Sequence, residues 1–265
     1  MRESDPTLWW AALGAVALLG LLVGSFLNVV IWRVPRGESV VRPPSACPGC
    51  GQAISARDNI PVLSWVLLRG RCRGCAEPIS LRYPLVEAGT AALFVGVALR
   101  FDLTGSLPAF LYLAAICVAL LLIDIDVRRL PDAIVLPAYV VLPVLLMLAA
   151  WVGEDWGSLL RAGIGGAGLY AFYFVAMAMY PGGMGFGDVK LAGVLGMALG
   201  WVGWGALVVG AFGAFLLGGV FSIVLLVLRR ADRKSGIPFG PWMIVGTALG
   251  IGCGEALWSA YLGLM

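Results

Sequence analysis

Histidine is absent from this sequence of 265 residues, and charged residues make up only 12% of it. Without histidine the chain has no Ser-His-Asp triad, no imidazole general base and no histidine metal ligand. Hydrophobic residues supply 61% of the chain, which is far too much for an ordinary soluble domain of this length. The net charge of +3 identifies no partner by itself. The chemistry must therefore come from the acids and cysteines of a membrane protein.

Long apolar runs predict an all-α polytopic membrane protein. A bilayer core about 30 Å thick needs roughly 20 apolar residues per helix. Backbone polar groups in lipid must bond internally, and these runs do not alternate as the strands of a barrel would. We expect about eight transmembrane helices, at residues 8–32, 84–100, 107–125, 133–152, 160–180, 189–203, 205–228 and 240–262. Small-residue clusters such as Gly163/Gly166/Ala167 and Gly210/Gly213 are expected to let these helices pack closely.

The basic residues indicate which side of the membrane each loop faces. All but three of the eighteen Lys and Arg fall on the side opposite the N-terminus. They lie in residues 33–83, 126–132, 181–190 and 229–236. By the positive-inside rule this side is the cytoplasm, and an even number of spans places both termini outside.

A polar insert, residues 33–83, separates the first two predicted spans. It carries two C-x2-C pairs, which are Cys47 with Cys50 and Cys72 with Cys75. Two such pairs can supply four thiolates to one zinc ion at about 2.3 Å. Disulfides or redox dithiols are the alternatives, although a reducing cytoplasm disfavours structural disulfides. We predict a small cytoplasmic zinc-binding insert, and we expect Cys117 and Cys253, which lie within spans, to be packing residues.

Two acids stand at the ends of predicted spans. Asp124 ends the run AAICVALLLID, and Asp188 closes the turn Gly185-Phe-Gly-Asp188 before the run VKLAGVLGMALG. An ionisable group within a span costs roughly 2.5–3.5 kcal/mol on insertion scales and usually marks a functional site. Each aspartate alone is explained as a helix cap or a salt bridge to Lys190 or an arginine. Two of them on one predicted face favour a catalytic pair.

Paired carboxylates hydrolyse a peptide when one is ionised and the other is protonated, because one then activates water and the other donates to the carbonyl oxygen. Asp124 ends a predicted helix, where the helix dipole disfavours negative charge, and Asp188 begins one, where the dipole favours it. We therefore expect Asp124 to hold the shared proton and Asp188 to be the base.

Three further acids have simpler interpretations. Asp126 is expected to be solvated beside two arginines, and Asp132 to be the N-cap of the fourth span. Glu87 is expected to reach the interface or to pair with Arg82, with a secondary functional role as the alternative.

Several segments together resemble one known family. They are residues 24–33 (GSFLNVVIWR), 44–50 (PSACPGC), 58–65 (DNIPVLSW), 71–75 (RCRGC), 78–84 (PISLRYP), 124–132 (DIDVRRLPD), 185–190 (GFGDVK) and 237–241 (IPFGP). The chain is similar to the type IV prepilin peptidases, aspartyl proteases of the bacterial inner membrane. The resemblance implies removal of the basic leader of prepilins and pseudopilins after glycine, with Asp124 and Asp188 as the catalytic pair. It also implies N-methylation of the new N-terminus with S-adenosylmethionine, an activity of many members that carry the cysteine insert.

The prediction divides the chain into a first transmembrane helix (1–32), the four-cysteine insert (33–83) and a membrane peptidase core (84–265). The expected partners are prepilins or pseudopilins and the lipid bilayer, not nucleic acid. A transporter or channel that uses intramembrane carboxylates is the alternative function. A membrane thiol oxidoreductase is a third, although its cysteines would be expected near the outer face or a quinone site.

Overall fold

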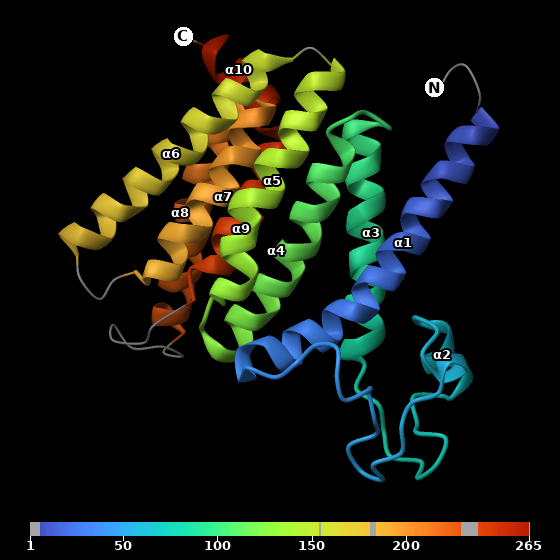
Figure 1. The fold of residues 1–265 in the computed structure, drawn as a ribbon. Helices are drawn as coiled ribbons and strands as arrows, with labels where there is room; N and C mark the ends of the chain where they lie inside the picture. Colours follow the sequence, from blue (N-terminus) through green and yellow to red (C-terminus); the bar gives the residue numbers. More distant parts are fainter. Residues whose placement is uncertain (1–5, 154, 181–183, 229–237, 265) are drawn as a thin grey trace. The chain divides into compact units, whose positions relative to one another are not determined.

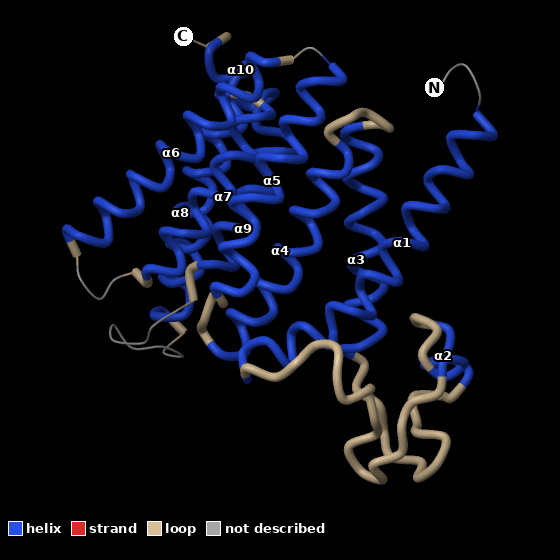
Figure 2. The backbone as a smooth tube through the Cα atoms, viewed as in Figure 1, coloured by secondary structure: helices blue, strands red, loops and turns tan. Residues whose placement is uncertain are grey.

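The computed structural model describes residues 6–153, 155–180, 184–228 and 238–264. Over these residues the regular elements are helical, and the only strand-like features are two isolated bridges in the insert. Figures 1 and 2 show the helices and the loop-rich insert. The helices are α1 (Pro6–Arg33), α2 (Leu63–Leu67), α3 (Arg82–Phe101), α4 (Leu107–Val127), α5 (Asp132–Gly153), α6 (Trp156–Met179), α7 (Phe186–Val202), α8 (Trp204–Val227), α9 (Gly240–Leu249) and α10 (Glu255–Leu262). The predicted all-α membrane fold is confirmed.

Seven of the helical segments in the described chain are long and apolar enough to cross a membrane. The last of them joins α9 to α10 through a π-helical turn, Gly250–Gly254. The predicted span at 189–203 is α7, which has only 17 residues. At 1.5 Å per residue it is about 25 Å long, short of a bilayer core of about 30 Å. Eleven of its residues are buried, because α7 lies inside the protein rather than against lipid. The predicted basic loop at 229–236 lies outside the described residues.

The chain forms two compact units. The first comprises residues 1–107 with 114–119, and the second comprises 108–113 with 120–265. All of α3 therefore groups with α1 and the insert. The predicted boundary at residue 84 separates the insert from the peptidase core by function. The division into compact units does not test a functional boundary, so this boundary stays a prediction.

In the first unit, α1 and α3 pack against each other through glycines of α1 (Figure 1). A Cβ atom at Gly20 would lie 2.6 Å from the Cα of Ala91, and one at Gly24 would lie 2.7 Å from the Cα of Glu87. Only glycine allows two helix backbones to approach this closely. The Nδ2 group of Asn28 adds a hydrogen bond to the carbonyl oxygen of Tyr83 at 3.2 Å.

In the second unit, α6 runs along the buried helix α7, again through glycines. A Cβ atom at Gly165 would lie 2.6 Å from the carbonyl oxygen of Gly196. The predicted small-residue cluster on α6 is therefore partly correct. Gly166 contacts α7, whereas a Cβ atom at Gly163 would meet nothing within 4 Å. The helical period decides which glycine faces the partner.

Arg161 of α6 fixes the C-terminal end of α7. Its Nε donates to the carbonyl oxygen of Gly200 at 2.6 Å, and its guanidinium also donates to that of Trp201 at 2.8 Å. The last carbonyl groups of a helix have no partner within the helix, and a cation there also complements the helix dipole.

The α6–α7 contact yields a stability prediction. Gly165→Ala should lower the midpoint of thermal unfolding of the purified protein, because the added methyl meets backbone that cannot move aside, at a cost of about 1–3 kcal/mol. Gly163→Ala, on the same helix, should leave the midpoint unchanged or raise it slightly. Equal midpoints for the two variants would contradict the packing described.

Candidate functional site

Asp124 lies in the last turn of α4, in the second unit, and only 5% of it is exposed. Its Oδ2 atom is buried and has no hydrogen-bond partner among the described residues. A Cβ atom at Gly240, the first residue of α9, would lie 2.6 Å from this oxygen. An unpartnered carboxylate oxygen in an apolar interior is costly. Such an atom is a candidate for direct contact with a reactant.

Asp188 lies in the first turn of α7 and is also buried. Its Oδ2 accepts a hydrogen bond from the backbone N–H of Gly185 at 3.1 Å, and its own N–H donates to the carbonyl oxygen of Gly185. This reciprocal capping fixes the carboxylate at the positive end of the helix dipole. Leu130 packs against both Gly187, next to Asp188, and Gly240, next to Asp124, so the fold brings to one region two acids that are 64 residues apart in sequence.

Lys190 joins the start of α7 to the start of α5. Its ammonium group pairs with the carboxylate of Asp132, the first residue of α5. The hydroxyl of Tyr139 on α5 donates to the carbonyl oxygen of Lys190 at 2.6 Å. The sequence suggested Asp132 as a helix cap and Lys190 as a salt-bridge partner of Asp188. The structure pairs Lys190 with Asp132 instead. The carboxylate of Asp188 accepts its hydrogen bond from the backbone of the glycine turn.

Aromatic packing holds the start of α9 beside Asp124. The ring of Phe239 lies 6.2 Å from that of Tyr173 and 5.2 Å from that of Phe215, centroid to centroid. Tyr173 is buried on α6, and the charge of Asp188 acts on it. The cluster fixes Phe239 and with it the adjacent Gly240. Tyr173 was not predicted from the sequence, because a tyrosine in an apolar run gives no indication of which residues of other helices it contacts.

Leu130 fills the space between the two glycine motifs. A Cβ atom at Gly187 would lie 3.1 Å from the Cβ of Leu130, and one at Gly240 would lie 3.4 Å from its Cδ2. The loop between α4 and α5 therefore packs against the starts of both α7 and α9. This residue too was missed from the sequence, because its role depends on contacts between distant segments.

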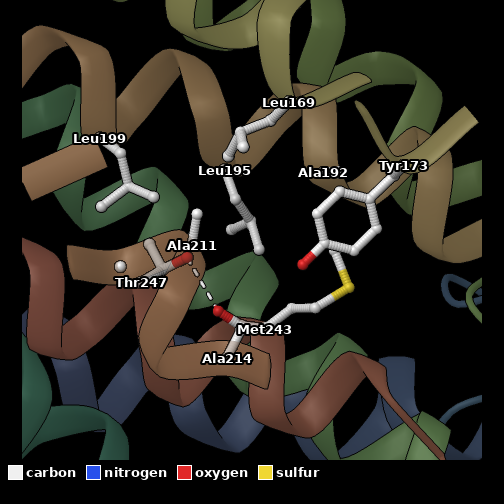
Figure 3. Close-up of a pocket in the computed structure, with 10 residues that line it drawn as sticks. Leu169, Tyr173, Ala192, Leu195, Leu199, Ala211, Ala214, Met243 and Thr247 are labelled. Carbon is white, nitrogen blue, oxygen red and sulfur yellow. Dashed lines mark hydrogen bonds between the residues drawn. The ribbon is translucent and has the colours of Figure 1, made fainter. Parts of the chain in front are cut away.

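A small cavity lies among α6, α7, α8 and α9 (Figure 3). Its lining is apolar except for Tyr173 and Thr247, whose hydroxyl donates to the carbonyl oxygen of Met243 at 2.8 Å. Neither Asp124 nor Asp188 is among its lining residues. The two acids therefore lie outside the lining of the cavity, although Tyr173, which packs against Phe239, is part of it.

The four cysteines of the insert form a second cluster, in the first unit. Their sulfur atoms all lie within 4.8 Å of one another, and the Sγ atoms of Cys47 and Cys75 are 3.7 Å apart. Four sulfurs at about 2.3 Å from a central ion in tetrahedral geometry are separated by about 3.8 Å. All six cysteines of the chain are described, and all are free thiols. The cluster can hold a metal ion.

The two cysteine pairs share one backbone pattern. In the first, the N–H of Cys47 donates to Gln52 and the N–H of Gly51 donates back to Cys47. In the second, Cys72 is bonded in the same way with Glu77 and Ala76. Each hairpin thus places its two sulfurs on one side. The backbone N–H groups of Cys75 and Gly74 lower the pKa of Cys72 to about 7, which favours its thiolate form. The backbone N–H of Glu77 lowers the pKa of Cys75, but burial and the three neighbouring thiols outweigh it and raise this pKa to about 12.

A bidentate ion pair connects the second hairpin to the segment before α2. Arg73 donates from Nε to both carboxylate oxygens of Asp58, each at 3.0 Å, and also from its terminal nitrogen. The Arg73 guanidinium lowers the pKa of Asp58, with smaller contributions from Ser55 and Arg57. The cysteine cluster is therefore linked directly to the 58–65 segment.

Glu87 has a partner that its sequence position did not suggest. It is buried in α3, and its Oε2 accepts the backbone N–H of Val62 at 2.7 Å. This bond joins the carboxylate of Glu87 to the insert. From the sequence we expected Glu87 to reach the interface or to pair with Arg82, and we did not expect a partner in the insert. Gly24 of α1 packs against the Glu87 backbone, which explains the burial.

Comparison with known proteins decides the family. The family described as "Type IV leader peptidase family" matches residues 111–223, and the "Bacterial Peptidase A24 N-terminal domain" matches residues 18–101. A "Prepilin leader peptidase/N-methyltransferase" of Aeromonas hydrophila is 36% identical, over 96% of this chain and 94% of the relative. The chain belongs to the type IV leader peptidase family.

Other relatives agree with this family assignment. Proteins of the same name from Pseudomonas putida and Pseudomonas aeruginosa are each 35% identical. The alignments cover 94% and 92% of this chain, and 93% and 91% of the relatives, respectively. No solved structure matches the chain. The leader peptidase match contains both aspartates, and the N-terminal match contains all four insert cysteines.

The cysteine cluster yields a prediction about metal content. The full-length protein, purified without chelators, should carry about one metal ion per chain, since four convergent sulfurs provide a complete tetrahedral site. Cys72→Ser should lower this content, whereas Cys253→Ser, outside the cluster, should not. Elemental analysis measures both. Unmodified protein without metal would contradict the assignment.

Proposed function

We propose that this member of the leader peptidase family is a membrane aspartyl endopeptidase that removes the basic leader of type IV prepilins and pseudopilins after glycine. The observation that carries the proposal is the burial of Asp124 and Asp188 at two helix ends of one compact unit, with Leu130 packed against the glycine motif beside each acid. The family assignment and the names of the relatives support the substrate class.

The reaction follows from two carboxylates that share one proton. The ionised carboxylate takes a proton from water as the water oxygen attacks the scissile carbonyl, and the protonated carboxyl donates to the carbonyl oxygen. The tetrahedral intermediate then collapses as the C–N bond breaks and the amine leaves with a proton. No covalent enzyme intermediate is required, which agrees with a chain that has no histidine to activate a nucleophile.

The surroundings of the two acids support different roles. Asp188 accepts a backbone N–H at the start of α7, where ionised carboxylates are favoured. Asp124 is in the last turn of α4 and has a buried oxygen without a partner, which is better tolerated by a neutral carboxyl. We assign the shared proton to Asp124 and the base role to Asp188. The Asp132–Lys190 pair and Tyr139 would then hold α7 at the distance that this proton sharing requires.

The insert and the second activity complete the proposal. Zinc is the metal that best fits four cysteine sulfurs in two C-x2-C hairpins, and Cys47, Cys50, Cys72 and Cys75 would hold it as a structural ion. Methyl transfer from S-adenosylmethionine to the amine exposed by cleavage is proposed from the names of the relatives. The inner membrane is the proposed location, with the insert and both aspartates on the cytoplasmic side. Protease digestion of the insert in intact spheroplasts would contradict this orientation.

The transporter alternative has no support from the comparisons, since the relatives share one enzyme name. Both acids also lie in terminal turns of their helices, whereas ion pathways are typically built on groups near the middle of the membrane.

Asparagine substitutions test the catalytic pair. Asp124→Asn or Asp188→Asn should each abolish leader removal from a prepilin incubated with the purified enzyme, because each removes one half of the acid–base pair. Asp126→Asn should retain most activity, since this exposed residue lies outside the pair. The same incubation with methyl-labelled S-adenosylmethionine reports methyl transfer. Full processing by either of the first two variants would refute the assignment.

The same variants distinguish the two roles. An infrared band of a protonated carboxyl group near neutral pH should disappear in Asp124→Asn and persist in Asp188→Asn. Persistence of the band only in Asp124→Asn would reverse the assignment of acid and base.

Gly240→Ala tests whether the start of α9 shapes the site. The added methyl would displace the carboxylate of Asp124, so cleavage should fall by roughly tenfold or more, as expected when overpacking costs about 1–3 kcal/mol. Gly219→Ala is the control, because a Cβ atom there meets nothing within 4 Å. If the two variants cleave a prepilin at equal rates while both insert normally, Gly240 does not limit the site.

A further inference from the structure

The arginine-rich insert presents an apolar surface on its one α-helix, α2. Leu63, Val66 and Leu67 are 49%, 56% and 69% exposed. Positions i, i+3 and i+4 lie on one side of a helix, so these three side chains form a single apolar face. We call them the outer face of α2. Isolated apolar residues are ordinary on a protein surface, but a contiguous apolar face needs an explanation.

Hydrogen bonds fix the direction in which this face points. Ser64 is buried, accepts the backbone N–H of Ile60 at 2.9 Å and donates to the carbonyl oxygen of Arg57 at 3.0 Å. The indole N–H of Trp65 donates to the carbonyl oxygen of Ile79 at 3.0 Å. These contacts tie the opposite side of α2 to the insert. The helix therefore cannot rotate to hide the outer face.

The bond between Val62 and Glu87 sets the level of α2 along the membrane helix α3. Glu87 lies five residues after the start of α3, which corresponds to about 7 Å along the axis. Val62 directly precedes α2, so α2 begins beside the first two turns of α3, as Figure 1 also shows. The headgroup region on each side of a bilayer is roughly 5–8 Å thick. Because α3 is itself long and apolar enough to span the membrane, this level corresponds to the lipid–water interface.

The neighbouring surface matches such an interface. At the start of α3, Leu81 and Leu85 are 60% and 66% exposed, so the membrane helix beside α2 also carries apolar surface at this level. Arg57, Arg69 and Arg71, which lie before and after α2 in the chain, are exposed. Arginines beside a short apolar face suit anionic headgroups above a hydrocarbon boundary.

We infer that the outer face of α2 lies in the lipid–water interface of the membrane that α1 and α3 span, as a third anchor of the metal-binding insert. The occupant of this surface is the bilayer itself, with its anionic headgroups at the arginines. The insert is then held to the membrane through α1, α3 and α2, and its cysteine cluster is fixed at a defined height above the lipid. The inference does not depend on the proposed peptidase activity.

Lipid-borne quenchers test this placement directly. A fluorescent amino acid is incorporated at position 67 of the full-length protein, which is reconstituted in nanodiscs of phosphatidylcholine and phosphatidylglycerol. Emission is compared with and without lipids that carry a nitroxide near the top of the acyl chain. The control carries the same label at Ile54, which is 43% exposed and belongs to the first cysteine hairpin. Quenching at position 67 should be at least twofold stronger than at position 54.

Each other outcome overturns the inference. Equal quenching at the two positions, or none at position 67, would show that α2 does not enter the lipid interface. The nitroxide lipids could leave the emission at position 67 unchanged while addition of a prepilin shifts it to the blue. This result would assign the outer face to substrate binding. Removal of phosphatidylglycerol should weaken the quenching at position 67, and an increase would contradict the role given to the arginines.

Discussion

Backbone contact between α6 and α7 is the constraint on which the second unit depends. Because glycines replace side chains along this contact, a 17-residue helix can lie inside the protein with Asp188 in its first turn. Arg161 holds one end of α7, and the pairing of Lys190 with Asp132 holds the other. A buried carboxylate needs such fixed surroundings, since displacement by 1 Å would change both its hydrogen bonds and its distance to a second acid.

The site combines two kinds of local chemistry at helix ends. At the start of α7 the carboxylate of Asp188 accepts a backbone N–H, whereas the Oδ2 atom of Asp124, in the last turn of α4, has no hydrogen-bond partner among the described residues. The two acids consequently differ in environment although they are chemically identical. Phe239, fixed by Tyr173 and Phe215, keeps a glycine rather than a side chain against Asp124. A side chain at this position would displace the unpartnered oxygen.

In the first unit, polar contacts form a continuous path from the cysteine cluster to a membrane helix. The second hairpin holds Asp58 through Arg73, the following segment forms α2, and Val62 donates to the buried Glu87. An insert of about fifty residues has too little apolar core to fix its own position, so it depends on the cysteine cluster and on the bond to the buried Glu87. Arg73, which carries this link to Asp58, lies between Cys72 and Cys75 in the sequence.

The sequence by itself determined the class of fold, the approximate helices and the chemically important residue types. Apolar run length gives membrane helices directly, C-x2-C spacing gives convergent sulfurs, and motif resemblance gave Asp124 and Asp188 as the pair to consider. Only the tertiary structure decided that α7 is interior rather than a full-length span, that Lys190 pairs with Asp132, and that Glu87 binds the insert. These features depend on which residues of distant segments come into contact, and run length, spacing and periodicity describe each segment only by itself.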